Sequence, residues 1–254
     1  MTVSLYSRIV ANLLVPSSGA QWSAAASFRW RKPVNIILIG AQGSGKGTQA
    51  EILEQTLGVH HVASGDLFRK AFDDKTELGI RAKEYTDRGE LVPDDITVSM
   101  VLTRIKEPDC VKDGVLLDGF PRTIAQAQAL DKGLKDLGRT IDRVIYLEVP
   151  RDVLQRRLAG RYICRAHQHV YNIHTNPPKV PGICDIDGSE LYQRSDDRGE
   201  AVQKRLDIFF NETINLLGYY DRQHKVIKVN GNQSIERVTQ NLLAAINNYA
   251  EKKR

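Results

Sequence analysis

The segment Gly40–Thr48, which reads Gly-Ala-Gln-Gly-Ser-Gly-Lys-Gly-Thr, is the feature that most restricts how this chain can fold. It follows the short, β-branched apolar run Val34–Ile39 and leads into Thr48–Leu57, where apolar residues recur at helical spacing. A glycine-rich turn between a strand and a helix allows backbone N–H groups to converge at the positive end of the helix. The sequence therefore predicts a P-loop that holds the phosphates of a nucleoside triphosphate.

Within this loop the glycines permit the tight turn and Lys46 reaches the outer phosphates. Gly47 occupies the position where such loops usually have Ser or Thr, so Thr48 offers the hydroxyl nearest the metal. A glycine turn with a surface lysine is the alternative, which the strand before the loop and the helix after it argue against. The residues predicted to contact the triphosphate here are Gly43, Ser44, Gly45, Lys46, Gly47 and Thr48.

Four more apolar runs read as strands, and helical stretches lie between them. Because parallel strands need long crossovers, this alternation predicts an open α/β core, a parallel five-stranded sheet with helices on both faces. Ser234 is expected to cap the last helix. The predicted strands besides Val34–Ile39 are His60–Ala63, Val115–Leu117, Val144–Val149 and Val226–Val229.

Two stretches break the alternation, and we interpret both as insertions into the core. The first insertion, Ser64–Val92, is charged and helical in pattern. The second insertion, Gly160–Asp197, is rich in Gly, Pro, His, Cys and aromatic residues without a helical period. The core domain is then expected to consist of residues 33–63, 93–159 and 198–254.

Asp118 follows the third predicted strand, at the carboxyl edge where open α/β sheets bind ligands. A carboxylate beside a P-loop is expected to hold Mg²⁺, through water. A solvated aspartate at a strand end is the alternative.

The second insertion contains two pairs of metal-ligating residues with short internal spacing: Cys164-x₂-His167 and Cys184-x₂-Asp187. Tetrahedral zinc sites use this spacing, and a segment with few apolar residues gains a fixed structure from a closed four-ligand site. We therefore expect structural Zn²⁺ on Cys164, His167, Cys184 and Asp187. His169 is a nearby competitor for His167, and the alternative to a metal is a hydrogen-bonded polar cluster with two reduced thiols.

The charge of the chain is concentrated at its beginning. The net charge is +5, but four positive charges lie in residues 1–32 and the rest carries about +1, which argues against a nucleic-acid partner. The leader has Arg and Ser, no acidic residue and an apolar helical face, which is typical of an organellar transit peptide. We expect the mitochondrial matrix rather than a plastid, or the cytoplasm if the leader is an inert tail. A membrane span is not expected, because no run of eighteen apolar residues occurs.

Several motifs in the same order resemble adenylate kinase in its long-lid form, over roughly residues 34–250. Besides the P-loop they are Ser-Gly-Asp-Leu-Phe-Arg at 64–69, Asp-Gly-Phe-Pro-Arg-Thr at 118–123, Asn-Pro-Pro-Lys at 176–179 and Arg-Ser-Asp-Asp at 194–197. The resemblance implies reversible, Mg²⁺-dependent phosphoryl transfer from ATP to AMP, giving two ADP in adenine nucleotide homeostasis, by a chain expected to be a monomer. The first insertion would bind the monophosphate and the second would be a lid over the triphosphate.

The resemblance also places functional residues. Those implied for ATP beyond the loop are Arg157, Arg161, Val170, Tyr171 and the backbone near Gln233. Those implied for AMP are Ser64, Arg69, Glu90, Leu91, Val92, Gly119, Phe120, Arg122, Gln126, Arg194 and Arg205. Those implied in catalysis are Lys46, Asp118, Arg122, Arg161, Arg194 and Arg205.

The chemistry supports so many arginines independently, because two nucleotides bring about six negative charges together and one Mg²⁺ offsets only two. No general base is expected, since the attacking oxygen belongs to a phosphate that is already ionised.

Two other functions stay open at this point. One is a related kinase that uses GTP as donor or acts on another monophosphate, and Gln126 argues for AMP because its amide matches the edge of adenine. The other is a P-loop switch that hydrolyses nucleotide, which would lack both insertions and their arginines.

Overall fold

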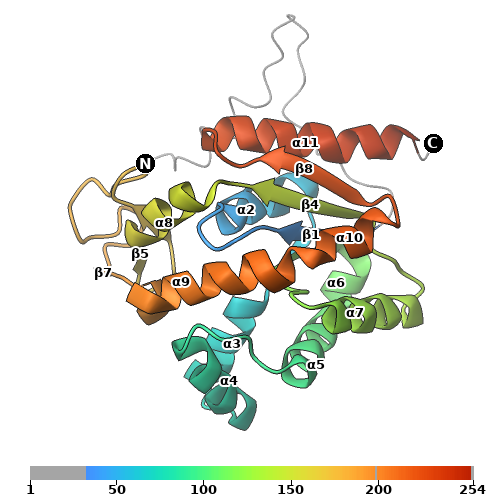
Figure 1. Ribbon diagram of the computed structural model, residues 1–254, viewed down its shortest axis with the longest axis horizontal. Coiled ribbons are helices and arrows are strands. Elements are labelled where there is room, and N and C mark those ends of the chain that lie inside the picture. The colour runs from blue at the N-terminus through green and yellow to red at the C-terminus, as the bar shows by residue number, and fades with distance from the viewer. Residues whose placement is uncertain (1–32, 198, 253–254) are drawn as a thin grey trace, which may run out of the picture.

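The computed structural model describes residues 33–197 and 199–252. Its centre is a parallel five-stranded sheet in the order β2-β3-β1-β4-β8 (Figure 1). This confirms the predicted fold class, and each predicted strand is present within one or two residues. The strands are β1 (Val34–Ile39), β2 (His60–Ala63), β3 (Gly114–Asp118), β4 (Arg143–Glu148) and β8 (Val226–Asn230). The predicted transit peptide lies outside the described residues.

Alternating side chains of β1 supply the cores on the two faces of the sheet. Ile36 and Leu38 pack on one side and Ile37 and Ile39 on the other, and all four are nearly inaccessible. A strand buried on both faces has no polar alternation, which is why Val34–Ile39 reads as a continuous apolar run. Each fully buried Ile or Leu contributes about 1.5–3 kcal/mol to folding.

One face of the sheet is covered by α2 (Lys46–Leu57) and α11 (Ile235–Lys252). The long α11 runs across the sheet beside β8 in Figure 1. The backbone N–H of Arg237 donates to Ser234 Oγ over 3.3 Å, so Ser234 caps this helix as predicted.

The opposite face is covered by a larger group of helices, which share one apolar core with the sheet. The helices α8, α9 and α10 lie together in Figure 1, and α5, α6 and α7 flank the other half of the sheet. The group comprises α5 (Asp94–Ile105), α6 (Pro108–Asp113), α7 (Ile124–Asp136), α8 (Arg151–Ala159), α9 (Gly199–Ile208), the π-helical turn η2 (Phe209–Thr213) and α10 (Asn215–Asp221).

The first insertion folds into α3 (Ser64–Asp73) and α4 (Glu77–Asp87), which project from the sheet in Figure 1. The helix α4 begins after Thr76, whose Oγ1 accepts the N–H of Gly79 over 3.1 Å. A small separate core supports the pair. The helical pattern predicted for this segment is therefore correct.

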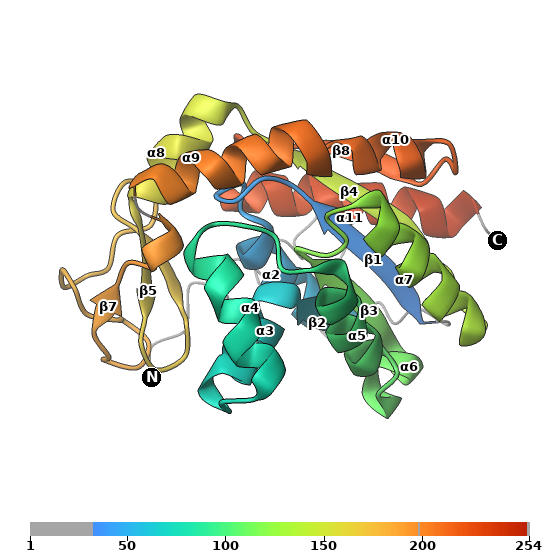
Figure 2. The same ribbon diagram turned by 60° about the horizontal axis from the view of Figure 1, so that its bottom comes forward.

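The second insertion contains a three-stranded antiparallel sheet in the order β6-β5-β7, seen at one end of the molecule in Figure 2. Its strands are short and bring two cysteines into a small buried cluster. Strands of two to four residues carry little periodic pattern from which to read them in the sequence. They are β5 (Arg161–Cys164), β6 (Val170–Asn172) and β7 (Leu191–Tyr192), followed by the 3₁₀ turn η1 (Ser195–Asp197).

The carboxyl ends of β1, β2 and β3 lie at one edge of the sheet because the three strands are parallel neighbours. The P-loop follows β1, the first insertion follows β2, and Asp118 is the last residue of β3. The fold thus gathers the predicted motifs at one edge. Among the described helices, none is both long and apolar enough to cross a membrane.

Candidate active site

The P-loop has the backbone conformation that binds anions. Gly43 and Gly45 have φ angles of 81° and 96°, in the left-handed region that a side chain would disfavour. No side chain caps α2, which begins directly after Gly45. The first N–H groups of this helix therefore remain available, and with the helix dipole they favour phosphate.

Lys46 folds back over the loop. Its Nζ donates to the carbonyl oxygens of Gly40 and Ala41 over 2.8 and 3.1 Å and lies 3.9 Å from Asp118 Oδ1. Burial, together with three nearby arginines, lowers the pKa of Lys46 to about 8 against the opposing effect of Asp118. The amine is thus held where an added negative charge stabilises its protonated form.

Asp118 lies between Lys46 and a residue that the sequence analysis missed, His61 on β2. His61 Nε2 is 3.7 Å from Asp118 Oδ2, and both side chains are largely buried. Burial alone would raise the pKa of Asp118, but Lys46 and His61 hold it below its usual value. The pKa of His61 is raised, since Asp118 outweighs the effect of burial. Because β2 and β3 are adjacent, only strand order brings this histidine to the carboxylate.

Five arginines from four parts of the chain surround this position, and with Lys46 they form what we call the cation cluster. Burial lowers the pKa of Arg122 and of Arg194, and nearby arginines lower them further: Arg205 acts on Arg122, and Arg69 and Arg161 act on Arg194. After burial, which is the larger effect, the pKa of Arg122 and of Arg194 falls to about 10. The members are Lys46, Arg69, Arg122, Arg161, Arg194 and Arg205.

A buried carboxylate, Asp197, organises two members of the cluster. Arg161 Nε donates to Asp197 Oδ2 over 2.6 Å, and Arg205 Nη1 lies 3.2 Å from Oδ1. The side chain of Asp197 is completely inaccessible. Arg205 also contacts Asp196 over 2.7 Å. Asp197 thereby connects the start of the second insertion to α9, a role that its place in the Arg-Ser-Asp-Asp motif did not reveal.

Arg194 is held differently, by a neutral side chain. Its Nη2 donates to Gln168 Oε1 over 3.3 Å, while its Nε is buried without a hydrogen-bond partner among the described residues. A neutral acceptor leaves the charge of the guanidinium available for an anion. Gln168 was not predicted, and it has the left-handed φ of 60°.

On the monophosphate side, Gly119 connects three predicted residues. Its carbonyl oxygen accepts Ser64 Oγ and Arg122 Nε, each over 2.8 Å, and its φ is 73°. Phe120 is buried in the main core and supports this turn. Arg69 contacts Asp66 at the start of α3.

The next predicted segment, residues 90–92, packs between α4 and α5. The carboxylate of Glu90 is occupied by Lys204 over 2.8 Å and by Arg88 over 3.0 Å, and its backbone N–H donates to the carbonyl oxygen of Tyr85 over 3.0 Å. Val92 is buried and Leu91 half-buried.

Gln126 is 1% exposed and lies between two polar partners. Its Oε1 accepts the backbone N–H of Arg122 over 2.7 Å, and its Nε2 donates to Asp94 Oδ1 over 2.6 Å. Asp94 is a further residue that the sequence analysis did not select. An amide group has two donors and two lone pairs, so one of each remains.

The residues expected near the base of ATP differ in their surroundings: one joins two loops of the core, and two are exposed. Arg157 donates to the carbonyl oxygen of Gly231 over 3.2 Å and reaches that of Gly43 at 3.5 Å, joining the P-loop to the loop after β8. Gln233 is exposed and accepts a hydrogen bond from Asn241 over 2.9 Å. The side chain of Val170 is 41% exposed.

Tyr171, which the resemblance places near ATP, has its ring in the interior of the second insertion. The ring is buried in the small cluster of the second insertion, and its hydroxyl lies 3.4 Å from Cys184 Sγ and accepts the N–H of Asp185 over 2.8 Å. Because β6 alternates its side chains, the exposure of Val170 requires Tyr171 to face inward.

The predicted metal site is present with one change of ligand. The atoms that lie within 4.8 Å of one another come from Cys164, His169, Cys184 and Asp187, so His169 takes the place predicted for His167. His169 Nδ1 is 3.3 Å from Cys164 Sγ and 3.4 Å from Cys184 Sγ. The side chain of His167 is 69% exposed; its Nδ1 lies 2.9 Å from Asp187 Oδ2, and its ring lies against that of His169. The reason is the antiparallel pairing of residues 164 and 169, which the spacing pattern does not contain.

The donors of this cluster suit zinc. Tetrahedral zinc with bonds of about 2.0–2.3 Å separates its ligand atoms by roughly 3.3–3.8 Å, and the observed separations include 3.2, 3.3 and 3.4 Å. The backbone N–H groups of His167 and His169 also donate to Cys164 Sγ over 3.4 and 3.2 Å, which stabilises a thiolate. Hydrogen bonds from Ser189 hold the pKa of Asp187 well below its usual range.

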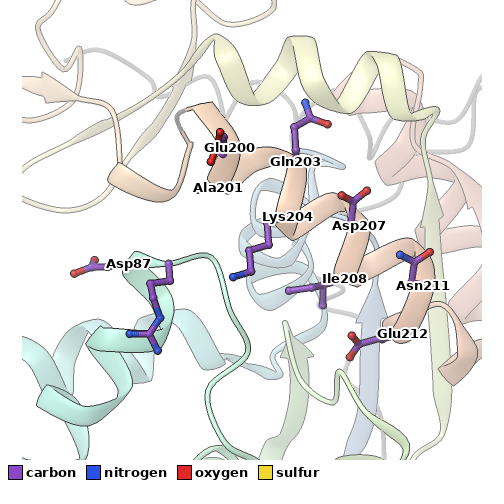
Figure 3. A pocket seen from close by; sticks show the side chains of 10 residues that line it. Asp87, Glu200, Ala201, Gln203, Lys204, Asp207, Ile208, Asn211 and Glu212 are labelled. Atoms are coloured by element: carbon purple, nitrogen blue, oxygen red, sulfur yellow. The ribbon is translucent and has the colours of Figure 1, made fainter.

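A groove of about 680 Å³ between the end of α4 and α9 is a separate feature (Figure 3). It is lined by charges of both signs, among them Asp87, Glu200, Lys204 and Asp207. No residue that lines it belongs to the P-loop or the cation cluster. The phosphate-binding chemistry therefore lies elsewhere, at the carboxyl edge of the sheet.

A P-loop on a parallel sheet, a carboxylate beside its lysine, and arginines from two insertions define a nucleoside monophosphate kinase, a class of P-loop phosphotransferases. Comparison with known proteins specifies the family. Residues 38–225 match the family model described as adenylate kinase, and the chain belongs to the adenylate kinase family. Membership confirms the function predicted from the motifs and disfavours the two alternatives.

The relatives are similar over nearly their whole length. The adenylate kinase of Carboxydothermus hydrogenoformans is 49% identical over 219 residues, covering 86% of this chain and 100% of that protein. That of Bacillus subtilis is 49% identical over 205 residues, covering 81% of this chain and 94% of that protein. That of Listeria monocytogenes is 48% identical over 205 residues, with 81% and 95% covered.

Proposed function

We propose that this chain transfers the terminal phosphoryl group of ATP to AMP, giving two ADP in a reversible reaction. The observation that carries this proposal is the cation cluster around the P-loop, in which burial and neighbouring arginines lower the pKa values of Lys46, Arg122, Arg194 and Arg205. So many buried cations are unfavourable without anions. Two nucleotides supply the missing negative charge.

On the donor side, the backbone N–H groups of Gly43–Thr48 and the amine of Lys46 bind the phosphates of ATP. Asp118 would hold Mg²⁺ through water, and the ion would offset phosphate charge. Arg157 and the backbone near Gln233 border the base. Arg161 reaches the transferred group from the second insertion.

On the acceptor side, Arg69, Arg122, Arg194 and Arg205 hold the phosphate of AMP in line for attack. The amide of Gln126 takes the edge of adenine. No residue need act as a general base, since the attacking phosphate oxygen is already ionised. Catalysis is positioning and charge stabilisation.

We also propose the division into domains: residues 64–92 bind the monophosphate, residues 160–197 form a lid, and the remainder after residue 32 is the core. Water competes with AMP as the acceptor, so the site must exclude it during transfer. Residues 64–92 and residues 160–197 both border the carboxyl edge of the sheet, where they can cover the nucleotides.

The metal of the lid is proposed to be Zn²⁺ on Cys164, His169, Cys184 and Asp187. The mixed sulfur, nitrogen and oxygen donors and their separations support it. A closed four-ligand site gives the ion a structural role rather than a catalytic one. We also propose that the whole chain is a monomer. We propose further that residues 1–32 direct it to an organelle, the mitochondrial matrix rather than a plastid. Only the composition of the leader supports this targeting.

The decisive experiment is a panel of donors and acceptors with purified protein and Mg²⁺. ATP, GTP and ITP are each mixed with AMP, GMP, CMP and UMP, and the products are separated by chromatography. We expect ADP to form fastest from ATP and AMP. Lys46→Met should lower kcat at least about 100-fold, because one charge-stabilising donor is worth that much, with little loss of thermal stability. Wild-type protein that forms no ADP would refute the proposal.

A further inference from the structure

The side-chain amide of Gln126 has only one orientation available to it. On one side its Oε1 accepts the backbone N–H of Arg122 over 2.7 Å. On the other its Nε2 donates to Asp94 Oδ1 over 2.6 Å. Because the side chain is 1% exposed, water cannot replace either partner easily.

The chemistry of the two partners makes this orientation exclusive. A backbone N–H only donates, and an ionised carboxylate only accepts. If the amide rotated by half a turn, its NH₂ would face the N–H of Arg122 and its oxygen would face the carboxylate of Asp94. Both hydrogen bonds would be lost. A donor would be buried against a donor on one side, and an acceptor against an acceptor on the other.

Asp94 is itself fixed in position. It is the first residue of α5, and its second oxygen accepts Thr123 Oγ1 over 2.9 Å. Thr123 caps α7 by accepting the N–H of Gln126 over 3.1 Å. Asp94, Thr123 and Gln126 therefore form a closed ring of hydrogen bonds between two packed helices, and the carboxylate cannot turn away from the amide.

The fixed orientation determines which purine edge the amide can read. One N–H and one lone pair remain on Gln126, in a fixed order. Adenine presents a donor at its exocyclic N6 beside an acceptor at N1. Hypoxanthine and guanine present the reverse, an acceptor at O6 beside a donor at N1. An amide that could rotate would serve both edges, whereas a locked amide serves one.

We propose that Asp94 is the residue that determines selection of AMP over 6-oxopurine monophosphates, by locking the amide of Gln126. It is a positioning residue, since it acts through Gln126 and not on the nucleotide. The inference rests on the proposed function, in which Gln126 contacts the base of AMP.

The test compares AMP with IMP, whose base differs from adenine only at position 6 and N1. In Asp94→Asn the new side chain both donates and accepts, so it no longer rejects the rotated amide of Gln126, and only the backbone N–H of Arg122 still favours the original orientation. We expect the ratio of kcat/KM for AMP to that for IMP to fall at least about tenfold, with KM for ATP unchanged. Titration calorimetry with AMP and IMP should show the same loss of discrimination in binding.

The matched control is Asp95→Asn, which removes the same charge from the neighbouring, exposed position. It should keep the wild-type ratio, as should Asp94→Glu, which remains an acceptor only. An Asp94→Asn variant that loses AMP and IMP activity equally, or keeps the wild-type ratio, would overturn the inference. If this variant does not fold, Asp94→Ala, which removes the acceptor that holds Gln126 Nε2, tests the same point.

Gln126→Leu separates failure of the inference from failure of the proposed function. This variant should lose discrimination between AMP and IMP even with Asp94 in place, because it has no amide for Asp94 to orient. If Gln126→Leu keeps the wild-type ratio, Gln126 does not read the base and the proposed acceptor site is wrong. If Gln126→Leu loses discrimination and Asp94→Asn does not, only the lock is refuted.

Discussion

At the scale of single residues, the site is defined by charges held in unfavourable positions. Lys46 and Arg122 are buried near one another and both have lowered pKa values. Asp118 offsets part of this repulsion, and Asp197 offsets another part by pairing Arg161 with Arg205. The remaining positive charge stabilises bound phosphates. The protein therefore gains affinity for nucleotides and loses stability in its nucleotide-free state.

The lowered pKa of Lys46 predicts proton uptake on ATP binding. With a pKa of about 8 in the nucleotide-free protein, roughly three quarters of the amine is neutral at pH 8.5. Phosphate favours the protonated form, so calorimetry in buffers of different ionisation enthalpy should show uptake of about 0.7 proton per ATP at that pH. In Lys46→Arg, which stays charged, this uptake should be absent; equal uptake in both proteins would contradict the assignment.

The lowered pKa of Lys46 also determines how the stability of the protein changes with pH. The unfolded state binds more protons than the folded state between about pH 8 and the ordinary lysine value of 10.5. The contribution of Lys46 to the free energy of unfolding of the nucleotide-free protein therefore rises with pH across this window. Denaturation in urea, compared with Lys46→Met, measures it.

At the scale of elements, packing between helices leaves some polar groups satisfied and others not. Adjacent tyrosines on α10 show both cases. Tyr219 donates its hydroxyl to Asp131 of α7 over 2.8 Å. Tyr220 is fully buried, and its hydroxyl has no hydrogen-bond partner among the described residues.

This pair predicts opposite outcomes for the same substitution. Tyr219→Phe should lower the free energy of unfolding by about 1 kcal/mol, since one hydrogen bond is lost and an aspartate loses its donor. Tyr220→Phe should be neutral or stabilising, because the ring packing is kept while an unpaired hydroxyl is removed. Urea denaturation of the two variants decides, and an equal loss in both would show that Tyr220 has a partner.

The small sheet of the second insertion predicts which histidine binds metal. His169→Ala should lose zinc, whereas His167→Ala should retain close to one ion per chain, measured by elemental analysis after purification without chelator. Hydrogen exchange across residues 160–197 should accelerate in His169→Ala alone, because the segment has little apolar core of its own. The reverse pattern would return the ligand role to His167.

At the scale of the whole molecule, the sheet is the buried centre from which both insertions extend. Its two cores bury both faces, and the functional groups lie at its carboxyl edge. Residues 38–225 match the family model, and one relative is matched over all of its own length. We therefore expect the core to fold without residues 1–32.

Removal of residues 1–32 should therefore leave the enzyme intact. We expect kcat within about twofold and the melting temperature within about 2 °C of the full chain, since only a shift of a few tenths of a kcal/mol is anticipated. Fused to a fluorescent protein, residues 1–33 should direct it to mitochondria. Diffuse cytosolic fluorescence would refute the targeting proposal without affecting the catalytic one.

Several parts of this site could be predicted from sequence because they depend on local chemistry. The loop Gly40–Thr48 requires glycines at left-handed positions, and Ser234 caps a helix three residues from its bond partner. The residues that sequence reasoning missed act across the fold. His61 reaches Asp118 only because β2 and β3 are neighbours, and Asp94 reaches Gln126, 32 residues away, only because α5 packs on α7.

The sequence by itself determined the parallel α/β core, the phosphate-binding loop and the motifs of the family, since periodicity, turn residues and short spacings are written locally along the chain. Tertiary structure alone decided which histidine joins the two cysteines, where the ring of Tyr171 points and which carboxylate orients Gln126. Those outcomes depend on strand pairing and helix packing, which bring together residues whose separation in the chain carries no information about their distance in space.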